Sequence, residues 1–335
     1  MRAISKFLFA MKTKRVYRIR NWIEYNASLI QRGSILVWFS EEVRKNWYAP
    51  ADDREGRPRQ YSDIAIQAIL TLRTIFRFPL RGIQGAVMSI FAMAHIDLAV
   101  PNYTTLSRRM PKLAVEIGHN IDSEEPLVIA VDGTGFKVFG EGEWKVRQHG
   151  VGKRRTWRKG HFAVVANGKY KGRIVAQQGT GSDVHDCEVM EELLHRIPNP
   201  LLAVAADGAY DTTWERRLIE QRLAKALIPP RENARKWREE VRGEPILGAK
   251  PRNADIDRIA QIGVEAWKEE ICYHVRSLVE NTNFRIKTLF GERLASRRKQ
   301  GDTQDVEIAL RVYALNAFSQ FGMPESYAVP EARAA

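Results

Sequence analysis

The segment 273–287 carries four polar side chains of different chemistry at spacings that suit one side of a helix. They are a hydroxyl, a guanidinium, a carboxylate and an ammonium group, on Tyr273, Arg276, Glu280 and Lys287. No Gly or Pro interrupts the segment. We therefore expect one continuous helix, along which the four groups fall within about 60° of Tyr273 over about 21 Å. An Arg–Glu pair four residues apart is commonly a surface ion pair worth only a few tenths of a kcal/mol, so other segments must decide its meaning.

Two further carboxylates each follow an apolar run and precede a glycine. Asp132 ends the run 127–131, and Asp207 ends the run 201–206. Runs of this length and composition are typical of buried strands. An ionised carboxylate beside a buried strand is costly unless it is paired or bound to a metal. A single aspartate of this kind can be a simple cap or turn residue, but two of them together with Glu280 predict a site of three carboxylates.

The chemistry of such a site follows from its ligand type. Three carboxylates without His or Cys favour a hard, oxygen-seeking cation, so we expect Mg²⁺ or Mn²⁺. Two such ions about 3.5–4 Å apart can hold the attacking and leaving oxygens of an in-line phosphoryl transfer. Asp211 is a rival carboxylate, but it precedes Thr212 and a helical pattern, so we expect it to cap a helix over 212–223.

The charge of the chain indicates an anionic partner. The formal net charge is +13, and the eight Trp and ten Tyr occur among Arg and Lys residues, which favours DNA. Two basic runs lie between the predicted carboxylate segments or after the last one. Each alone could be a solvated loop, but together they favour contact with a DNA backbone and its bases. The first contains Lys145, Arg147, Lys153, Arg154, Arg155, Arg158 and Lys159 with Trp144, His149 and Trp157, and the second contains Arg293, Arg297, Arg298 and Lys299.

The N-terminal third has two basic features of its own. Residues 1–20 contain seven Lys or Arg and no acid, as expected of a basic arm that contacts phosphates or of a solvated tail. Helices are expected over 64–77, which Ser62 or Asp63 would cap, over 80–93 and from Tyr103 onward. This pattern in region 21–120 fits a helix-turn-helix, although many helical bundles share it. The basic residues expected to contribute to DNA binding in this region are Arg73, Arg77 and Arg81, which lie four residues apart in a ridge, together with Arg108 and Arg109.

Region 121–325 has the pattern of a mixed α/β sheet flanked by helices. Three strands come first, and strands then alternate with helices. The turn signal Asn167-Gly168 joins strands over 161–166 and 173–178 in a hairpin. The remaining elements are helix 185–197, strand 201–206, helix 212–223, strand 226–228, an irregular stretch 231–255, the long helix and helix 303–320.

Two observations concern membrane association and the cellular compartment of the protein. No apolar run approaches the 18 or more residues of a membrane span, so no membrane partner is expected. Cys187 and Cys272 form neither a metal-ligand spacing nor a disulfide framework, which fits a reducing cytoplasm.

These motifs resemble those of the DDE transposases of small bacterial insertion sequences. The spacing Tyr273-x2-Arg276-x3-Glu280-x6-Lys287 resembles the signature around the third catalytic acid of that family. Segments 131–138 and 206–211 resemble those around its first and second aspartates. The resemblance extends to 142–149 and 157–159 and covers nearly the whole chain.

The resemblance implies a ribonuclease-H-like catalytic domain preceded by a helical DNA-binding domain. Asp132, Asp207 and Glu280 would be the catalytic triad and the ligands of Mg²⁺ or Mn²⁺, with two ions expected. The substrate would be the terminal inverted repeats of a mobile element in the bacterial nucleoid. A freed 3′-hydroxyl would attack target DNA, and pairing two ends implies a homodimer or higher oligomer. The DNA contacts would include Tyr273, Arg276 and Lys287, with Lys137, Lys145, Arg147, Trp157, Arg158, Lys159, Arg81, Arg108 and Arg109.

Two other functions stay open at the level of sequence. The first is a transposase-derived DNA-binding regulator that does not cleave, although all three carboxylates are present. The second is a nucleotide-dependent phosphotransferase, because residues 132–135, Asp-Gly-Thr-Gly, would suit a phosphate-binding turn.

Overall fold

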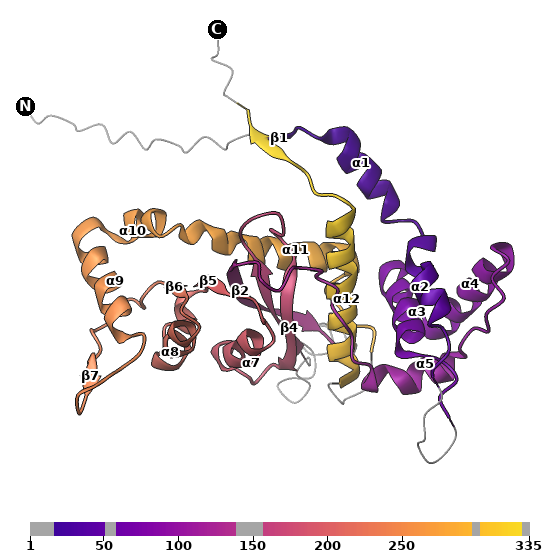
Figure 1. Ribbon diagram of the computed structural model, residues 1–335, viewed down its shortest axis with the longest axis horizontal. Helices are drawn as coiled ribbons and strands as arrows, with labels where there is room; N and C mark the ends of the chain where they lie inside the picture. The colour runs from indigo at the N-terminus through magenta and orange to yellow at the C-terminus, as the bar shows by residue number, and fades with distance from the viewer. Residues whose placement is uncertain (1–16, 51–57, 139–156, 297–301, 330–335) are drawn as a thin grey trace, which may run out of the picture. The chain divides into compact units, whose positions relative to one another are not determined.

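The computed structural model describes residues 17–50, 58–138, 157–296 and 302–329 (Figure 1). Contacts between Cα atoms divide the chain into two compact units, one made of Met1–Ser34 with Phe318–Ala335 and the other of Ile35–Ala317. In the first unit, β1 (Tyr17–Ile19) pairs antiparallel with β9 (Ser326–Ala328), and α1 (Trp22–Gln31) follows β1. The two terminal segments of the chain therefore associate through backbone hydrogen bonds.

The larger unit contains a five-stranded mixed sheet with the order β4–β3–β2–β5–β6. β2, β3 and β4 are antiparallel neighbours, whereas β5 and β6 run parallel to β2. The predicted hairpin is confirmed, since Gly168 adopts the left-handed φ of +59° that its turn requires. This order and direction are those of a ribonuclease-H-like sheet, as predicted. The strands are β2 (Leu127–Lys137), β3 (Trp157–Val165), β4 (Ile174–Gly181), β5 (Leu201–Ala205) and β6 (Lys225–Leu227).

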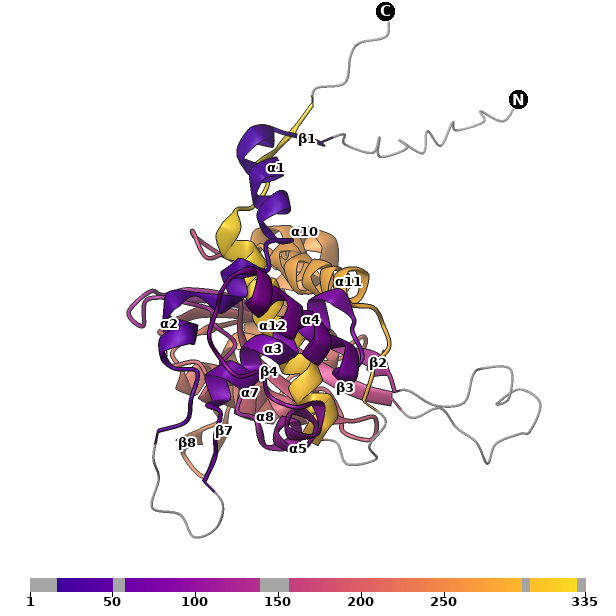
Figure 2. The same cartoon turned by 90° about the vertical axis from the view of Figure 1, so that its right-hand side faces the viewer.

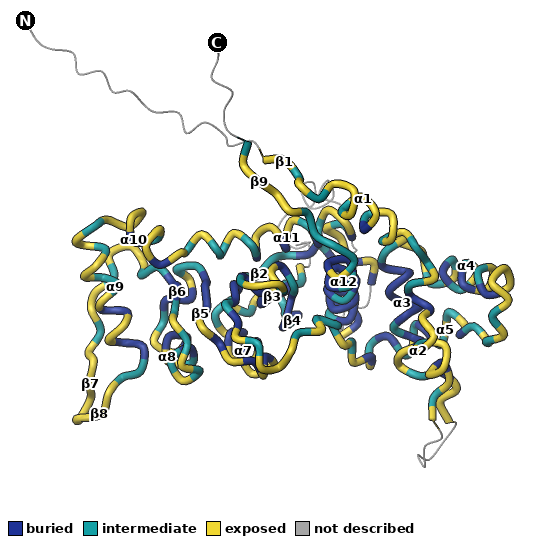
Figure 3. Tube along the Cα trace, turned by 45° about the horizontal axis from the view of Figure 1, so that its top comes forward, coloured by how far each residue is buried: buried dark blue, intermediate teal, exposed yellow. Residues whose placement is uncertain are grey.

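Helices cover both faces of the sheet (Figures 1 and 3). On one face, Ile129 and Val131 of β2 belong to a buried cluster with residues of α7 (Met190–His195) and α8 (Thr213–Gln221). Alternate residues of a strand point to opposite faces, so Asp132 lies on the other face. That face packs against α11 (Ser277–Phe290) and against the part of α12 (Asp302–Phe321) that belongs to this unit.

A helical cluster precedes the sheet in the same unit (Figure 2). α3 (Asp63–Phe76) begins as predicted, because the Ser62 hydroxyl accepts a hydrogen bond from Ala65 N at 3.1 Å. α3 packs against α4, α5 and also α11, which explains why most of its residues are buried. The other elements of this cluster are η1 (Leu36–Phe39), α2 (Glu41–Lys45), α4 (Leu80–Met93), α5 (Tyr103–Arg109) and η2 (Met110–Lys112).

The expected basic ridge of Arg73, Arg77 and Arg81 is wrong. Arg73 is only 8% exposed inside the packed surface of α3. Arg77 ends that helix in the left-handed conformation, with φ +55°. Arg81 lies on α4, beyond Pro79. The four-residue spacing therefore does not continue along one helix, because the chain changes direction between Arg77 and Arg81.

The single continuous helix over 273–287 is also wrong. α10 (Val264–Glu270) is followed by Cys272 in the left-handed conformation, with φ +58°. Tyr273–Arg276 then form a 3₁₀ turn, η6, and the α-helix starts only at Ser277. Tyr273 and Arg276 consequently lie on a tighter turn than Glu280 and Lys287, so the angles calculated for one regular helix do not apply to them.

Two other expectations about local structure are corrected. The stretch 231–255 is not wholly irregular, since it contains the hairpin of β7 (Glu240–Val241) and β8 (Glu244–Pro245) and the start of α9 (Ala249–Ile262). Arg242 and Gly243 both have positive φ, as a two-residue hairpin turn of type I′ requires. The other correction concerns β2, which continues through residues 132–135. These residues are strand and not turn, so the phosphate-binding turn expected of a phosphotransferase is not formed.

Candidate active site

The register of the parallel strands brings the two predicted aspartates together. Ala130 of β2 pairs with Ala205 of β5, and this is the last parallel pair between the two strands. Asp132 and Asp207 each lie two residues beyond that pair, so their side chains share a level and a face. Asp132 is not at a strand end as expected, because β2 continues its antiparallel pairing with β3 to Lys137. Asp207 does follow its strand, and its carboxylate accepts a hydrogen bond from Ala209 N at 2.9 Å in the turn η5 (Gly208–Tyr210).

Arg276 lies among all three predicted catalytic carboxylates. Its Nη2 is 3.9 Å from Asp132 Oδ1 and 3.9 Å from Asp207 Oδ2. Its Nη1 donates a hydrogen bond to Glu280 Oε1. The structure therefore brings Asp132, Asp207 and Glu280 to one place, with a guanidinium as their shared counter-ion. Within the described ranges, no three His, Cys, Asp or Glu side chains are arranged to hold a metal ion in this conformation.

The environment of Asp132 differs from that of an ordinary surface aspartate. Burial raises the pKa of Asp132 to about 6, although the positive charge of Arg276 opposes this shift. Asn283 Nδ2 donates a hydrogen bond to Asp132 Oδ2 at 3.2 Å. Asn283 is 8% exposed and was missed by the sequence analysis. The available signal was its position three residues after Glu280, which places both on neighbouring turns of one helix side.

The remaining members of the 273–287 motif lie along the same element. Tyr273 is half-buried, and burial raises the pKa of its hydroxyl. The ammonium of Lys287 lies 6.0 Å from the ring centre of Phe136, a residue on the face of β2 that also bears Asp132. The motif thus provides a basic group beyond the carboxylates along α11.

Several predicted DNA-contacting cations are already engaged within the protein. Each has at least one partner at hydrogen-bonding distance, so a contact with DNA would use its remaining hydrogen-bonding capacity or require the partner to be exchanged. The pairs are Lys137 with Glu292 at 2.8 Å, Arg158 with Asp305 at 2.6 Å, Lys159 with Val184 O at 2.7 Å and Arg109 with Tyr61 O at 2.8 Å.

The other predicted contacts have more open surroundings. Arg81 lies over the ring of Tyr103 at 4.7 Å, and Arg108 is exposed on α5. Trp157 is 36% exposed at the start of β3. Lys145 and Arg147, like most of the arm 1–20, fall outside the residues that the structure describes.

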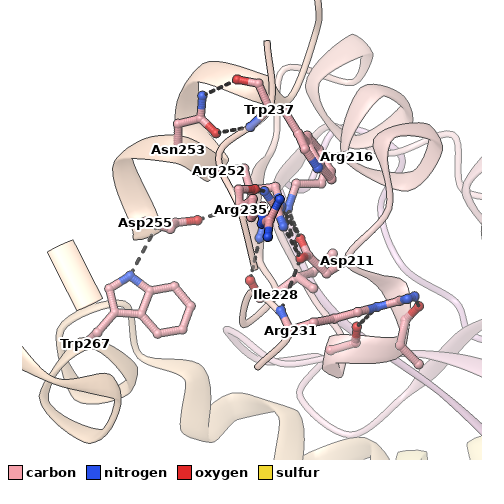
Figure 4. Close-up of polar contacts among 12 residues, drawn as sticks. Asp211, Arg216, Ile228, Arg231, Arg235, Trp237, Arg252, Asn253, Asp255 and Trp267 are labelled. Atoms are coloured by element: carbon pink, nitrogen blue, oxygen red, sulfur yellow. Dashed lines mark hydrogen bonds and ion pairs between the residues drawn. The ribbon is translucent and has the colours of Figure 1, made fainter. Parts of the chain in front are cut away.

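Asp211 is the centre of a buried ionic network and not a helix cap (Figure 4). Its carboxylate accepts hydrogen bonds from Arg216 Nε and Arg252 Nε, both at 2.9 Å. Thr212 occupies the N-cap position of α8, which corrects the prediction. Arg231 N also donates to Asp211, and the Arg231 side chain donates to the carbonyls of Gly208 and Ala209. The network therefore fixes the turn that follows Asp207.

The donor set of the site suits a divalent cation. All three converging ligands are carboxylates, the oxygen donors that Mg²⁺ and Mn²⁺ prefer. The guanidinium of Arg276 already places positive charge between them. A divalent cation has a higher charge density than a guanidinium and could bind the same three carboxylates if Arg276 moved away.

The mixed sheet and its converging acids define the chain as a ribonuclease-H-like protein. Family comparison identifies it further. A family model described as a transposase DDE domain matches residues 123–317, and a second model of the same description matches residues 30–141. The chain belongs to the DDE transposase family. It is accordingly a DNA-binding enzyme of a family that generally uses divalent metal ions.

Comparison with solved structures gives only a distant likeness. A structure described as a Drosophila P element transposase strand transfer complex shares 9% sequence identity, with 85% of this chain and 86% of that chain covered. The TM-score is 0.29, which is too low to support an argument about details. In the described parts of the chain, no helix has the length and apolar character needed to cross a membrane.

Proposed function

We propose that this transposase binds the terminal inverted repeats of its own insertion sequence, cleaves DNA at the element ends and joins the freed 3′-hydroxyl to target DNA. The observation that carries the proposal is the convergence of Asp132, Asp207 and Glu280 around Arg276. These acids come from a strand, from the turn that follows a second strand and from a helix, and the resemblance assigns the catalytic triad to the same three residues.

In this proposal, Asp132, Asp207 and Glu280 would hold two Mg²⁺ or Mn²⁺ ions, and these ions would supply activation of the attacking oxygen and stabilisation of the leaving oxygen. Asn283 keeps the Asp132 carboxylate oriented through its hydrogen bond. Arg276 leaves the carboxylates and, with Tyr273 and Lys287, contacts backbone phosphates of the transposon end. Lys287 lies about 10 Å from Glu280 by helix rise, which suits a different phosphate from the one that reacts.

The rest of the proposed organisation follows the predicted domains. Residues 1–20 act as a basic arm, 21–120 as a helical DNA-binding region with a helix-turn-helix, and 121–325 as the catalytic domain. α3, α4 and α5 pack against one another, which a helix-turn-helix requires of its helices. Two copies of the chain pair two element ends during the reaction in the bacterial cytoplasm.

The test uses conservative variants that remove charge and retain shape. Asp132→Asn, Asp207→Asn and Glu280→Gln should each abolish Mg²⁺-dependent cleavage of a duplex that carries the element end, while binding in a gel-shift assay survives. Asp257→Asn is the matched control, because Asp257 is an exposed acid that pairs with Lys236 on the surface. Full cleavage by any triad variant would refute the triad, whereas end binding without cleavage by the unaltered protein would identify a regulator.

A further inference from the structure

A small pocket between the C-terminal end of α3 and the segment after α11 is lined by four arginines. They are Arg73, Arg77, Arg293 and Arg311, and the cavity has a volume of about 120 Å³. Among the described residues that line the pocket, Glu307 is the one acid. A cavity of this volume can hold several water molecules, so it has room for a small tetrahedral anion.

Glu307 cannot neutralise this cluster, because its carboxylate is already saturated. It accepts hydrogen bonds from Arg311 Nη2, Ala295 N and both the backbone and the hydroxyl of Ser296. Glu307 is also buried. One acid thus pairs with one arginine, Arg311. Among the described residues, Arg73, Arg77 and Arg293 have no ion pair, and of these three only Arg73 is buried.

Arg73 is the most informative of the four. It is 8% exposed, and its Nε is buried and has no hydrogen-bond partner among the described residues. No ion pair of Arg73 occurs among the residues that the structure describes. A buried charge without a partner is costly. An anion in the pocket would remove that cost.

Helix capping accounts for only part of the arrangement. Arg77 donates to Leu289 O at 3.0 Å, and Arg311 donates to Gly291 O at 2.6 Å, so both cap the C-terminal end of α11. Arg73 and Arg293 make no such contact in the described structure. Capping therefore leaves unexplained why these two side chains line the same pocket.

Arg77, one of the four arginines, also has an unusual backbone conformation. Arg77 has φ +55°, a left-handed conformation that is uncommon for a non-glycine residue. Its guanidinium lies 3.6 Å from the position that a Cβ on Gly291 would take. Strained residues of this kind cluster at functional sites.

We propose that this arginine pocket binds a phosphate group, namely a backbone phosphodiester of the DNA strand that reaches the carboxylates. The proposal rests on the proposed function for the identity of the DNA. By helix rise, Phe290 beside the pocket is about 15 Å from Glu280. That distance lies within the reach of a few nucleotides of one B-form strand. The pocket would fix the register of the strand relative to Asp132, Asp207 and Glu280.

The first experiment measures thermal unfolding of the protein alone in inorganic phosphate and in NaCl at equal ionic strength. Phosphate should raise the Tm of the unaltered protein but not that of Arg73→Met, which should be at least as stable as the unaltered protein without phosphate. Arg293→Met should lose the phosphate effect too, and its exposed position makes it safe for folding. The control Arg217→Met removes an exposed charge on α8 and should retain the effect. Equal stabilisation of all variants by phosphate would overturn the proposal that this pocket binds a phosphate group.

The second experiment separates a free anion from a DNA phosphate. The slope of log Kd for end DNA against log salt should fall by about one in Arg73→Met and Arg293→Met, and stay unchanged in Arg217→Met. Phosphate stabilisation with an unchanged slope would overturn the assignment to DNA. The phosphate titration needs no cleavage, so it reports on the pocket even if the proposed reaction fails. If the unaltered protein cleaves DNA but the pocket variants behave like Arg217→Met in both experiments, the proposed phosphate pocket is overturned and the proposed function is not.

Discussion

The side chain of Asn283 donates a hydrogen bond to Asp132 Oδ2 at 3.2 Å across 151 residues of sequence. This contact joins α11 to β2 at the candidate active site. Because it favours one orientation of the Asp132 carboxylate, Asn283 is a positioning residue in the proposed mechanism.

Asn283→Ala should therefore lower the cleavage rate by about 10–100-fold, the usual effect of losing a residue that orients a metal ligand. The Mn²⁺ affinity, measured by calorimetry, should fall with it, while end-DNA affinity stays the same. Asn281→Ala is the control, because Asn281 is exposed on the same helix. Equal rates and equal Mn²⁺ affinities in the two variants would show that Asn283 does not position the Asp132 carboxylate.

Arg276 should compete with metal for the three carboxylates. Without metal, Arg276→Met leaves Asp132, Asp207 and Glu280 without their shared counter-ion. Mg²⁺ should consequently raise the Tm of this variant more than that of the unaltered protein, since no guanidinium must be displaced. Arg258→Met is the control, because Arg258 pairs with Glu270 away from the carboxylates. An identical Mg²⁺ response in Arg276→Met and the unaltered protein would contradict competition.

The network around Asp211 should be a major determinant of stability. Asp211→Asn leaves the buried guanidinium groups of Arg216 and Arg252 without their carboxylate, which should lower the free energy of unfolding by about 3–5 kcal/mol. Asp257→Asn, in an exposed pair, should change it little. Urea unfolding measures both. A small effect of Asp211→Asn would show that water or rearrangement satisfies the two arginines.

His161 should make stability depend on pH. Burial lowers the pKa of His161 from 6.5 to about 4, although nearby Asp186 opposes this shift. Between these values the unfolded chain binds a proton that the folded protein does not. The free energy of unfolding should therefore fall as the pH drops from about 6.5 to about 4, by up to about 3 kcal/mol, with no contribution above that window.

The measurement is urea unfolding across pH 4–7.5 for the unaltered protein and His161→Gln. Subtracting the two curves isolates His161 from the other titrating groups. The difference should slope only inside the window, and a flat difference would mean that the imidazole titrates equally in both states.

Much of the fold was predictable because it depends on local patterns. The apolar runs before Asp132 and Asp207 predicted buried strands, and the Asn167-Gly168 signal predicted the hairpin. Ser62 predicted the start of α3. Each of these signals is contained in a few neighbouring residues, so the sequence alone determines them.

The errors arose where distant packing decides the outcome. The four-residue spacing of Arg73 and Arg77 predicted a ridge on the surface. In the structure, α3 packs against other helices and Arg73 is buried, whereas Arg77 lies at the end of the helix. Asp211 precedes a helix and looked like a cap, but Arg252 of α9 approaches it and binds its carboxylate. Periodicity reports that a face is buried and does not report which partner covers it.

The sequence by itself determined which side chains are available for chemistry and on which kinds of element they lie. Only the tertiary structure decided that Arg276 lies between Asp132, Asp207 and Glu280, and that Asn283 supports Asp132. The physical reason is that parallel strand register and the position of α11 over the sheet depend on contacts between segments far apart in the chain. No local pattern in a single sequence encodes those contacts.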